Sequence, residues 1–251
     1  MPDSDIAELV ARATESSTAG RSDSGARRRA LAALIPALAR SARAAGFRAV
    51  AAGRWLVDEI VDLAPRVPVR DAATMRAQFP GLADDQIAER LVKTASMTTA
   101  ALGAAAGGLA GLEFLAPATL MAAPAQLAAE VLTVTAVELK LVAELHEILG
   151  RPATGSPTER SAAYLMSWVR RRAVRPQLGA AGLSAVFGAA AKRELRAHVL
   201  RRLGRSTTSF APFLAGAVAG AEVNRRATKS LGDNILAELR GAGVHGWFRR
   251  V

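Results

Sequence analysis

Apolar positions along the chain recur every three to four residues, the spacing of one face of an α-helix, and alternation at period two is absent. Residues 47–65 carry a clear apolar stripe, with Arg54, Asp58 and Asp62 stepping along the opposite face. The same spacing predicts about eight or nine helices in all. We therefore expect an all-α, multi-helix bundle. Its glycine-rich and apolar central helices would be residues 84–112 and 124–149.

Several residues predict where helices begin, bend or end. Ser156 and Glu159 have the spacing of a capping box, in which their side chains satisfy the first backbone N–H groups of a helix. Asp84 is the expected N-cap of the glycine-rich helix. Pro65 is expected to stop one helix and Pro36 to kink another.

Glycines recur at every fourth position in the helix at 84–112, and again near the C-terminus. Small residues at this spacing let helices approach closely, so we expect these glycines to pack against a neighbouring helix or a second subunit. The helix-packing candidates are Gly103, Gly107, Gly111, Gly216 and Gly220. A third interpretation is a hairpin of residues 94–112 and 114–137 that dips into a membrane, because residues 94–137 hold only two charges. Only three leucines support insertion of residues 94–112, which makes ordinary membrane spanning marginal.

The helix expected at 124–149 is apolar on two opposite faces, which predicts burial on most sides. Glu138 occupies the one polar slot of its apolar seam, and Glu130 lies on the same helix. A buried carboxylate must be paired, hydrogen-bonded or protonated, and the sequence offers Asn224, Arg225 and Arg226 as partners. We expect either a polar site inside an apolar bundle or an ion pair that fixes helix register.

Charge is divided unevenly along the chain. Residues 1–159 carry 16 Lys and Arg against 18 Asp and Glu, whereas residues 160–251 carry 17 against 4. The C-terminal part therefore favours a polyanionic partner, with an arginine-rich genome composition as the alternative explanation. The chain has no cysteine, and its acidic, amphipathic start lacks the basic and apolar regions of a signal peptide. We expect a cytoplasmic protein.

Arginines of the C-terminal part are interleaved with Trp, Phe and Leu in three clusters. This mixture suits an anionic lipid interface, where the cation meets phosphate and the indole lies at headgroup depth. The lipid-docking candidates are Trp168, Arg170, Arg171, Arg172, Arg175, Lys192, Arg193, Arg196, Arg201, Arg202, Trp247, Arg249 and Arg250. Two alternatives stay open: solvated helix faces, and nucleic-acid binding, for which no recognition helix or stacking aromatic is visible.

No motif in the chain points to catalysis. "GAGVHG" at 241–246 matches a dinucleotide-binding pattern but follows no strand, and "HEILG" at 146–150 lacks the second histidine of a zinc protease motif. The three histidines fall in separate segments. We expect no catalytic residue, no metal site and no cofactor. A lipid-acting hydrolase with a buried carboxylate site around Glu138 is the enzymatic alternative.

The stretches "TTAALGAAAGGLAGL", "LVAELHEILGRP" and "APFLAGAVAGAEVNRRATKSLG" resemble the EcsC family of bacterial proteins, over roughly residues 80–235. The charge of Glu222 departs from the more uniformly apolar pattern of similar proteins. The resemblance implies a helical, membrane-associated protein, named for a gene neighbourhood with an ATP-binding-cassette transporter, and implies no catalytic residues.

These patterns together predict three regions and a role. We expect an acidic, partly loose segment at 1–25, a helical region at 26–80 and an EcsC-like domain at 81–251. The expected role is non-enzymatic: docking on an anionic membrane surface, peripheral to or partly inserted in the cytoplasmic membrane, or accessory to a membrane protein complex. A homo-oligomer stays open as well.

Overall fold

The computed structural model describes residues 3–15, 24–46, 54–113, 123–172 and 213–245. Over these residues the chain is helical and holds no strand, so the prediction of an all-α fold is confirmed. The α-helices, with one short 3-10 turn, are α1 (Asp3–Glu15), α2 (Ser24–Ala45), α4 (Arg54–Leu63), η1 (Ala64–Arg66), α5 (Ala72–Gln78), α6 (Asp84–Glu113), α7 (Ala123–Ile148), α8 (Pro157–Arg172) and α10 (Phe213–His245).

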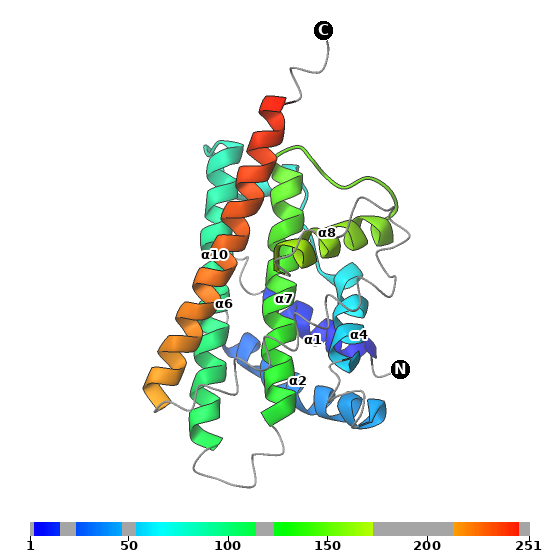
Figure 1. Ribbon diagram of the computed structural model, residues 1–251, viewed down its shortest axis with the longest axis vertical. Coiled ribbons are helices and arrows are strands. Elements are labelled where there is room, and N and C mark those ends of the chain that lie inside the picture. Colours follow the sequence, from blue (N-terminus) through cyan, green and yellow to red (C-terminus); the bar gives the residue numbers. More distant parts are fainter. Residues whose placement is uncertain (1–2, 16–23, 47–53, 114–122, 173–212, 246–251) are drawn as a thin grey trace.

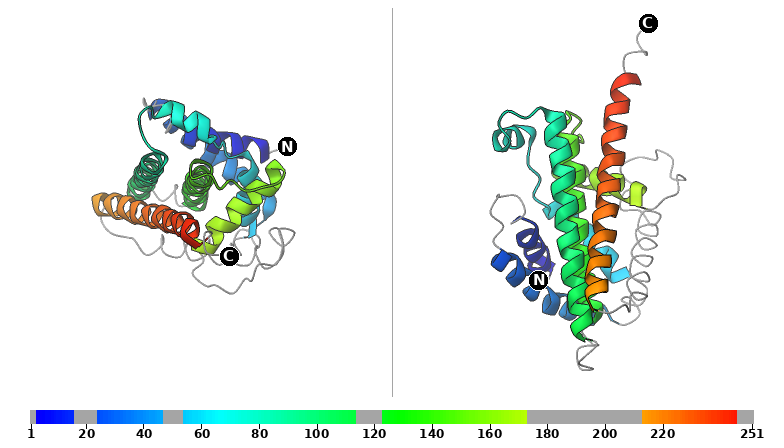
Figure 2. Two further views of the ribbon diagram at one scale, coloured as in Figure 1. Left: turned by 90° about the horizontal axis from the view of Figure 1, so that it is seen from above. Right: turned by 90° about the vertical axis from the view of Figure 1, so that its left-hand side faces the viewer.

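Three long helices form the body of the molecule. Figure 1 shows α6, α7 and α10 side by side, with α6 running opposite to the other two. The shorter α1 and α2 pack against α7 on the side away from α10 (Figure 2). Helix α8 lies across α7 and also contacts α10. The polar groups described below therefore lie where four helices meet.

Helix α7 is the centre of the bundle. Every residue from 131 to 139 is buried, and α7 contacts α1, α2, α4, α5, α6, α8 and α10. Both apolar faces expected from the sequence find neighbours, because α1, α2 and α4 pack from one direction while α6, α8 and α10 pack from others. Burial on most sides follows, as the all-round apolar pattern predicts.

Helix α10 lies directly against α6 through residues that have little or no side chain. A Cβ added at Gly220 would lie 2.7 Å from the carbonyl oxygen of Gly103, and one added at Gly103 would clash with Gly220 and with the Asn224 side chain. Farther along the same contact, Gly232 makes room for Val92. The two glycine faces thus meet each other. The other three candidate glycines lie within these helices, Gly107 and Gly111 in α6 and Gly216 in α10, but the structure does not describe what they pack against.

Helix starts match one expectation and correct another. The Ser156 N–H donates to Glu159 Oε2 at 2.7 Å and the Glu159 N–H donates to Ser156 Oγ at 3.4 Å, so the capping box is confirmed. Asp84, in contrast, is not the cap of α6. It is the first helical residue, and its carboxylate pairs with Arg76 of α5 at 2.8 Å, while Gln86 accepts the N–H of the preceding Ala83.

None of the helices in the described part of the chain combines the length and the apolar character that a membrane crossing requires. Pro176 also predicts the start of a helix that runs to about residue 203, and these residues lie outside the described ranges.

Candidate functional site

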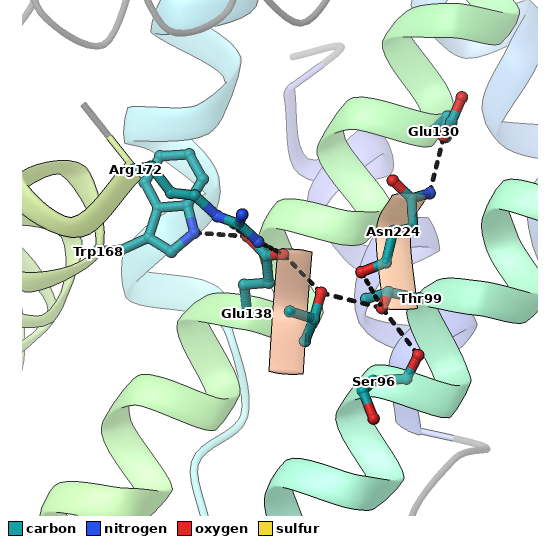
Figure 3. A network of polar contacts seen from close by, with 8 residues as sticks. Ser96, Thr99, Glu130, Glu138, Trp168, Arg172 and Asn224 are labelled. Carbon is teal, nitrogen blue, oxygen red and sulfur yellow. Dashed lines mark hydrogen bonds and ion pairs between the residues drawn. The ribbon is translucent and has the colours of Figure 1, made fainter. Parts of the chain in front are cut away.

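Glu138 lies at the middle of α7 with none of its surface exposed to solvent. Its two oxygens accept hydrogen bonds from two neighbouring helices (Figure 3). Trp168 Nε1 of α8 donates to Oε2 at 2.8 Å, and Thr228 Oγ1 of α10 donates to Oε1 at 2.7 Å. The guanidinium of Arg172, at the end of α8, forms an ion pair with the same carboxylate. We call Glu138, Trp168, Arg172, Thr228 and Thr99 the Glu138 cluster.

Thr99 extends this cluster to α6. Its hydroxyl donates to Thr228 Oγ1 at 2.9 Å, and Thr228 in turn donates to Glu138, so a chain of oriented hydrogen bonds crosses from α6 through α10 to α7. Both threonines are fully buried. The cluster therefore connects all four helices that meet at this point, with a formal charge that sums to zero.

Two of the expected lipid-docking residues belong to this buried cluster, which contradicts that part of the prediction. Trp168 is 1% exposed, and the Arg172 side chain is 12% exposed. The physical reason is the helical period: α8 buries the face that carries positions 165, 168 and 172, and Glu138 on α7 supplies a carboxylate at that face.

Arg171 also makes its contacts inside the protein and is only partly exposed. Its guanidinium pairs with Glu238 of α10 and donates to the Ser167 carbonyl oxygen at 2.8 Å. Arg170 alone among these three consecutive arginines is exposed. The remaining lipid-docking candidates lie outside the described residues: Arg175, Lys192, Arg193, Arg196, Arg201, Arg202, Trp247, Arg249 and Arg250.

Of the three partners expected from α10, Asn224 reaches one of the two predicted carboxylates, Glu130. Asn224, 4% exposed, donates from Nδ2 to Glu130 Oε1 at 2.9 Å. Glu130 lies on the same helix as Glu138, eight positions before it. The room for this amide comes from Gly103, whose missing side chain leaves space for Asn224. Figure 3 shows this contact beside the Glu138 cluster.

Glu130 is only partly buried, which corrects its assignment as a buried carboxylate. Arg225 and Arg226 reach neither Glu130 nor Glu138, so their assignment as partners is wrong. Arg225 donates to Glu222 at 2.7 and 2.8 Å, and Arg226 pairs with the same residue. These hydrogen bonds, first that of Arg225, lower the pKa of Glu222 to about 2. The three residues lie within one turn of α10, where i,i+3 and i,i+4 pairs meet on a helix surface. The charge of Glu222 is thus compensated locally.

A second buried carboxylate on α7 was missed by the sequence reasoning. Glu144 is 2% exposed and receives a bidentate pair from Arg70, with N–O distances of 2.8 and 2.7 Å. Lys140 lies 2.7 Å away on the same helix and also donates to the Pro68 carbonyl oxygen. We call Glu144, Arg70 and Lys140 the Glu144 clamp. The i,i+4 spacing of Lys140 and Glu144 was a visible signal, but nothing in the sequence pointed to Arg70, 74 positions away.

A third buried acid lies between α2 and α4. Ser41 Oγ donates to Glu59 Oε1 at 2.5 Å, and Trp55 Nε1 lies 2.9 Å from Ser41 Oγ and 3.1 Å from Glu59 Oε1. The combination of carboxylate, indole N–H and hydroxyl is the same as at Glu138. Both sites use an indole to satisfy a buried carboxylate, which a tryptophan can do while filling apolar space.

His146 and Tyr164 occupy the junction of α7 and α8. The His146 Nδ1–H lies 2.7 Å from the Val142 carbonyl oxygen, and the His146 and Tyr164 rings are 5.5 Å apart. Burial lowers the pKa of His146 and raises the pKa of Tyr164. The imidazole lies beside a phenol that donates to Glu147 at 3.3 Å.

The chemistry of these groups is that of helix-joining ion pairs and hydrogen bonds. The part of the chain that the structure describes holds no group of three or more His, Cys, Asp or Glu side chains arranged to bind a metal ion. Comparison of the chain with protein-family models, with curated proteins and with solved structures found no match.

Proposed function

We propose that the protein docks on an anionic membrane surface, as a non-enzymatic helical protein of EcsC type that is accessory to membrane machinery. In this proposal the helical bundle is a rigid body, and basic stretches of the chain bring it to the phosphate groups of the lipid. The docking is peripheral and reversible.

The separation of charge in the chain carries the proposal. The described residues contain 22 Lys and Arg against 20 Asp and Glu, which leaves them close to neutral. The other residues contain 11 against 2, and residues 173–212 and 246–251 supply nine of these cations. A basic excess gathered in short stretches attracts an anionic surface more strongly than the same excess spread over a body.

Ion pairs within the bundle explain why the described residues contribute little to this excess. Arg70 and Lys140 share Glu144, Arg172 pairs with Glu138, and Arg171 pairs with Glu238. Across the α6–α10 contact, Arg240 pairs with Asp85 and Glu89 at 2.9 and 3.2 Å. These cations are engaged in ion pairs within the described helices, so the docking candidates are the basic residues of 173–212 and 246–251.

Residue types next to the basic positions favour lipid over nucleic acid. Trp247 and Phe248 precede Arg249 and Arg250, and Leu and Val alternate with the cations of residues 192–205. Apolar and indole side chains beside arginine suit the lipid headgroup region. Nucleic-acid binding depends on the same phosphate contacts, so it is the competing outcome in the test.

Vesicle co-sedimentation of the full chain tests the proposal. We expect binding to vesicles that contain phosphatidylglycerol, weak binding to pure phosphatidylcholine, and release at high salt, because exposed charge attraction is screened. Alanine at the four basic residues Arg193, Arg196, Arg201 and Arg202 should weaken binding by more than about 100-fold, at about 1 kcal/mol per basic residue. Retention of the protein in membranes through a carbonate wash would favour insertion instead.

A matched control removes four exposed cations of the bundle by replacing Arg90, Lys93, Arg151 and Arg160 with alanine. This variant has the same net charge as the first and should keep most of the binding. Equal loss in both variants would reduce the effect to net charge and contradict the proposal. So would equal binding to neutral and anionic vesicles, or tighter binding to an oligonucleotide than to lipid. Arg171 and Arg172 are unsuitable as docking variants, since both form ion pairs between helices.

A further inference from the structure

The N-terminal half of the sequence contains a second basic region. Residues 24–57 contain seven arginines and no Asp or Glu, although residues 1–159 together carry a slight negative charge. Helix α2 accounts for five of these arginines. The average over the first 159 residues therefore conceals a stretch as basic as the C-terminal ones.

Helix α2 divides its surface between the core and solvent. Ala30, Leu34, Ala37, Leu38 and Ser41 are buried, and α2 packs against α1 and α7. The outward stripe follows the helical period and consists of arginine and small apolar residues. We call this stripe the α2 arginine face; its exposed members are Arg29, Ala32, Ala33, Pro36, Arg40, Arg43, Ala44 and Ala45.

The acidic residues near α2 are directed elsewhere. Glu8 of the neighbouring α1 pairs with Arg12 of its own helix, and Glu59 is bound on the buried side of α2 through Ser41. Within the described ranges, no acidic side chain forms an ion pair with Arg40 or Arg43. Because the two are exposed and three positions apart, their side chains leave the helix on the same outward face.

Helix α2 is on the opposite side of the bundle from α10. Figure 2 shows α6 and α7 between these two helices. Position 237, an exposed alanine on α10, therefore serves as a reference point on the far side.

We infer that the α2 arginine face is a surface of the folded bundle that meets the phosphate groups of an anionic membrane, an inference that rests on the proposed function and adds the orientation of the bundle. Guanidinium groups match phosphate geometry, and the small residues between them allow close approach. The lipid surface is the occupant that follows from the proposed function, and a nucleic acid, whose phosphates arginine also binds, is the competing outcome of the test. Its apolar residues are only Ala and Pro, so contact is electrostatic and shallow.

The first experiment replaces Arg40 and Arg43 with alanine in the full chain and measures binding to phosphatidylglycerol vesicles at low salt. At about 1 kcal/mol per basic residue near an acidic surface, the affinity should fall by about 30-fold. The charge-matched control, Arg90→Ala with Arg151→Ala, should lose less than about threefold. Circular dichroism confirms that both variants remain helical.

A second experiment uses the absence of cysteine, which lets single cysteines be labelled without removing others. An environment-sensitive fluorophore at Ala33→Cys or Ala44→Cys should respond to anionic vesicles, and the same fluorophore at Ala237→Cys should not. Equal responses at all three positions would overturn the inference.

The outcomes separate the two proposals. If the unmodified protein does not bind anionic vesicles, the proposed function is wrong. If it binds them while the Arg40 and Arg43 variant binds as well as its control, only the role of α2 fails. Loss of oligonucleotide binding without loss of vesicle binding in that variant would assign the face to nucleic acid and overturn the inference.

Discussion

Glu138 and Glu144 are two buried carboxylates on one helix, less than two turns apart, and the protein satisfies them in different ways. Glu138 receives its donors from α8 and α10 and lies deep in the bundle. Glu144 receives Arg70 from the connector before α5 and Lys140 from its own helix. The first joins helices to each other, and the second fastens a connector to the bundle.

The difference lies in the balance of charge and in the other partners of the cations. Arg70 and Lys140 are 14% and 12% exposed, much like Arg172 at 12%, but in the Glu144 clamp two cations serve one carboxylate. The Glu138 cluster has one cation for one carboxylate, and its other donors, Trp168 and Thr228, are almost fully buried. Removing a partner at Glu138 therefore leaves an uncompensated charge. In the clamp, Arg70 also donates to Gln78 and Lys140 to the Pro68 carbonyl oxygen, and either cation remains at Glu144 when the other is removed.

The largest expected effect is at the Glu138 cluster. Glu138→Leu, or Arg172→Leu, should lower the free energy of unfolding by about 3–5 kcal/mol, because each leaves an uncompensated charge in the interior. The double variant Glu138→Leu with Arg172→Leu should recover much of this loss, since neither charge remains. Urea unfolding followed by circular dichroism measures all three.

Arg170→Leu is the matched control for Arg172→Leu, because it removes an exposed arginine two positions earlier on α8. Its effect should stay within about 0.5 kcal/mol. If the two arginine variants were equally stable, Arg172 would have no special role in joining α8 to α7.

The Glu144 clamp should be less sensitive. Glu144→Ala is expected to cost about 1–3 kcal/mol, because it removes charge-assisted hydrogen bonds while Arg70 keeps Gln78 and Lys140 keeps the Pro68 carbonyl oxygen as acceptors. Arg70→Ala should cost a similar amount, and the two effects should not add in the double variant. A loss at Glu144 as large as that at Glu138 would end the distinction between the two sites.

A smaller effect is expected at Thr228, which bridges Thr99 and Glu138. Thr228→Val keeps the shape of the side chain but removes one donor to the carboxylate, at a cost of about 1–2 kcal/mol in unfolding free energy. Thr94→Val, at an exposed position of α6, is the control and should be close to neutral. Equal stability of the two variants would show that Thr228 adds nothing to the cluster.

The smallest expected effect is the pH dependence from His146. Burial lowers the pKa of this histidine in the folded protein, so below about pH 6.5 the unfolded chain binds more protons than the folded one. Stability from this group is complete above that pH and is lost as pH falls toward the folded pKa. His146→Gln should flatten the change in urea midpoint between about pH 8 and about pH 5.5. An unchanged pH profile would contradict this assignment.

The apolar periodicity of the sequence correctly predicted an all-helical fold and the central position of α7. The apolar seam of α7, the capping box at Ser156 and the close approach of glycines on α6 and α10 all depend on local spacing, which a single sequence displays. The assignment of Asp84 as the N-cap was wrong because aspartate is common both at N-caps and in ion pairs of the first helical turn, and the sequence alone does not distinguish the two.

Partner choice in the site could not be predicted in the same way. Glu138 was recognised as a buried carboxylate, but Arg172 and Trp168 were assigned to lipid because their neighbours in sequence are basic and aromatic. The direction in which a side chain at the end of α8 points depends on how α8 crosses α7, and that crossing is a tertiary property. Glu144 and Arg70 were missed for the same reason, since they meet across 74 positions.

The contact of Gly103 with Gly220 has a consequence for synthesis and folding. These residues are 117 positions apart, so α6 leaves the ribosome long before its neighbour exists, and a contact between distant parts of a chain forms slowly. Until the 33 residues of α10 arrive, Thr99 has no hydroxyl to donate to, and Glu138 lacks one of its donors. A nascent chain that stalls before α10 should therefore be a substrate for chaperones, although most of its helices are already made.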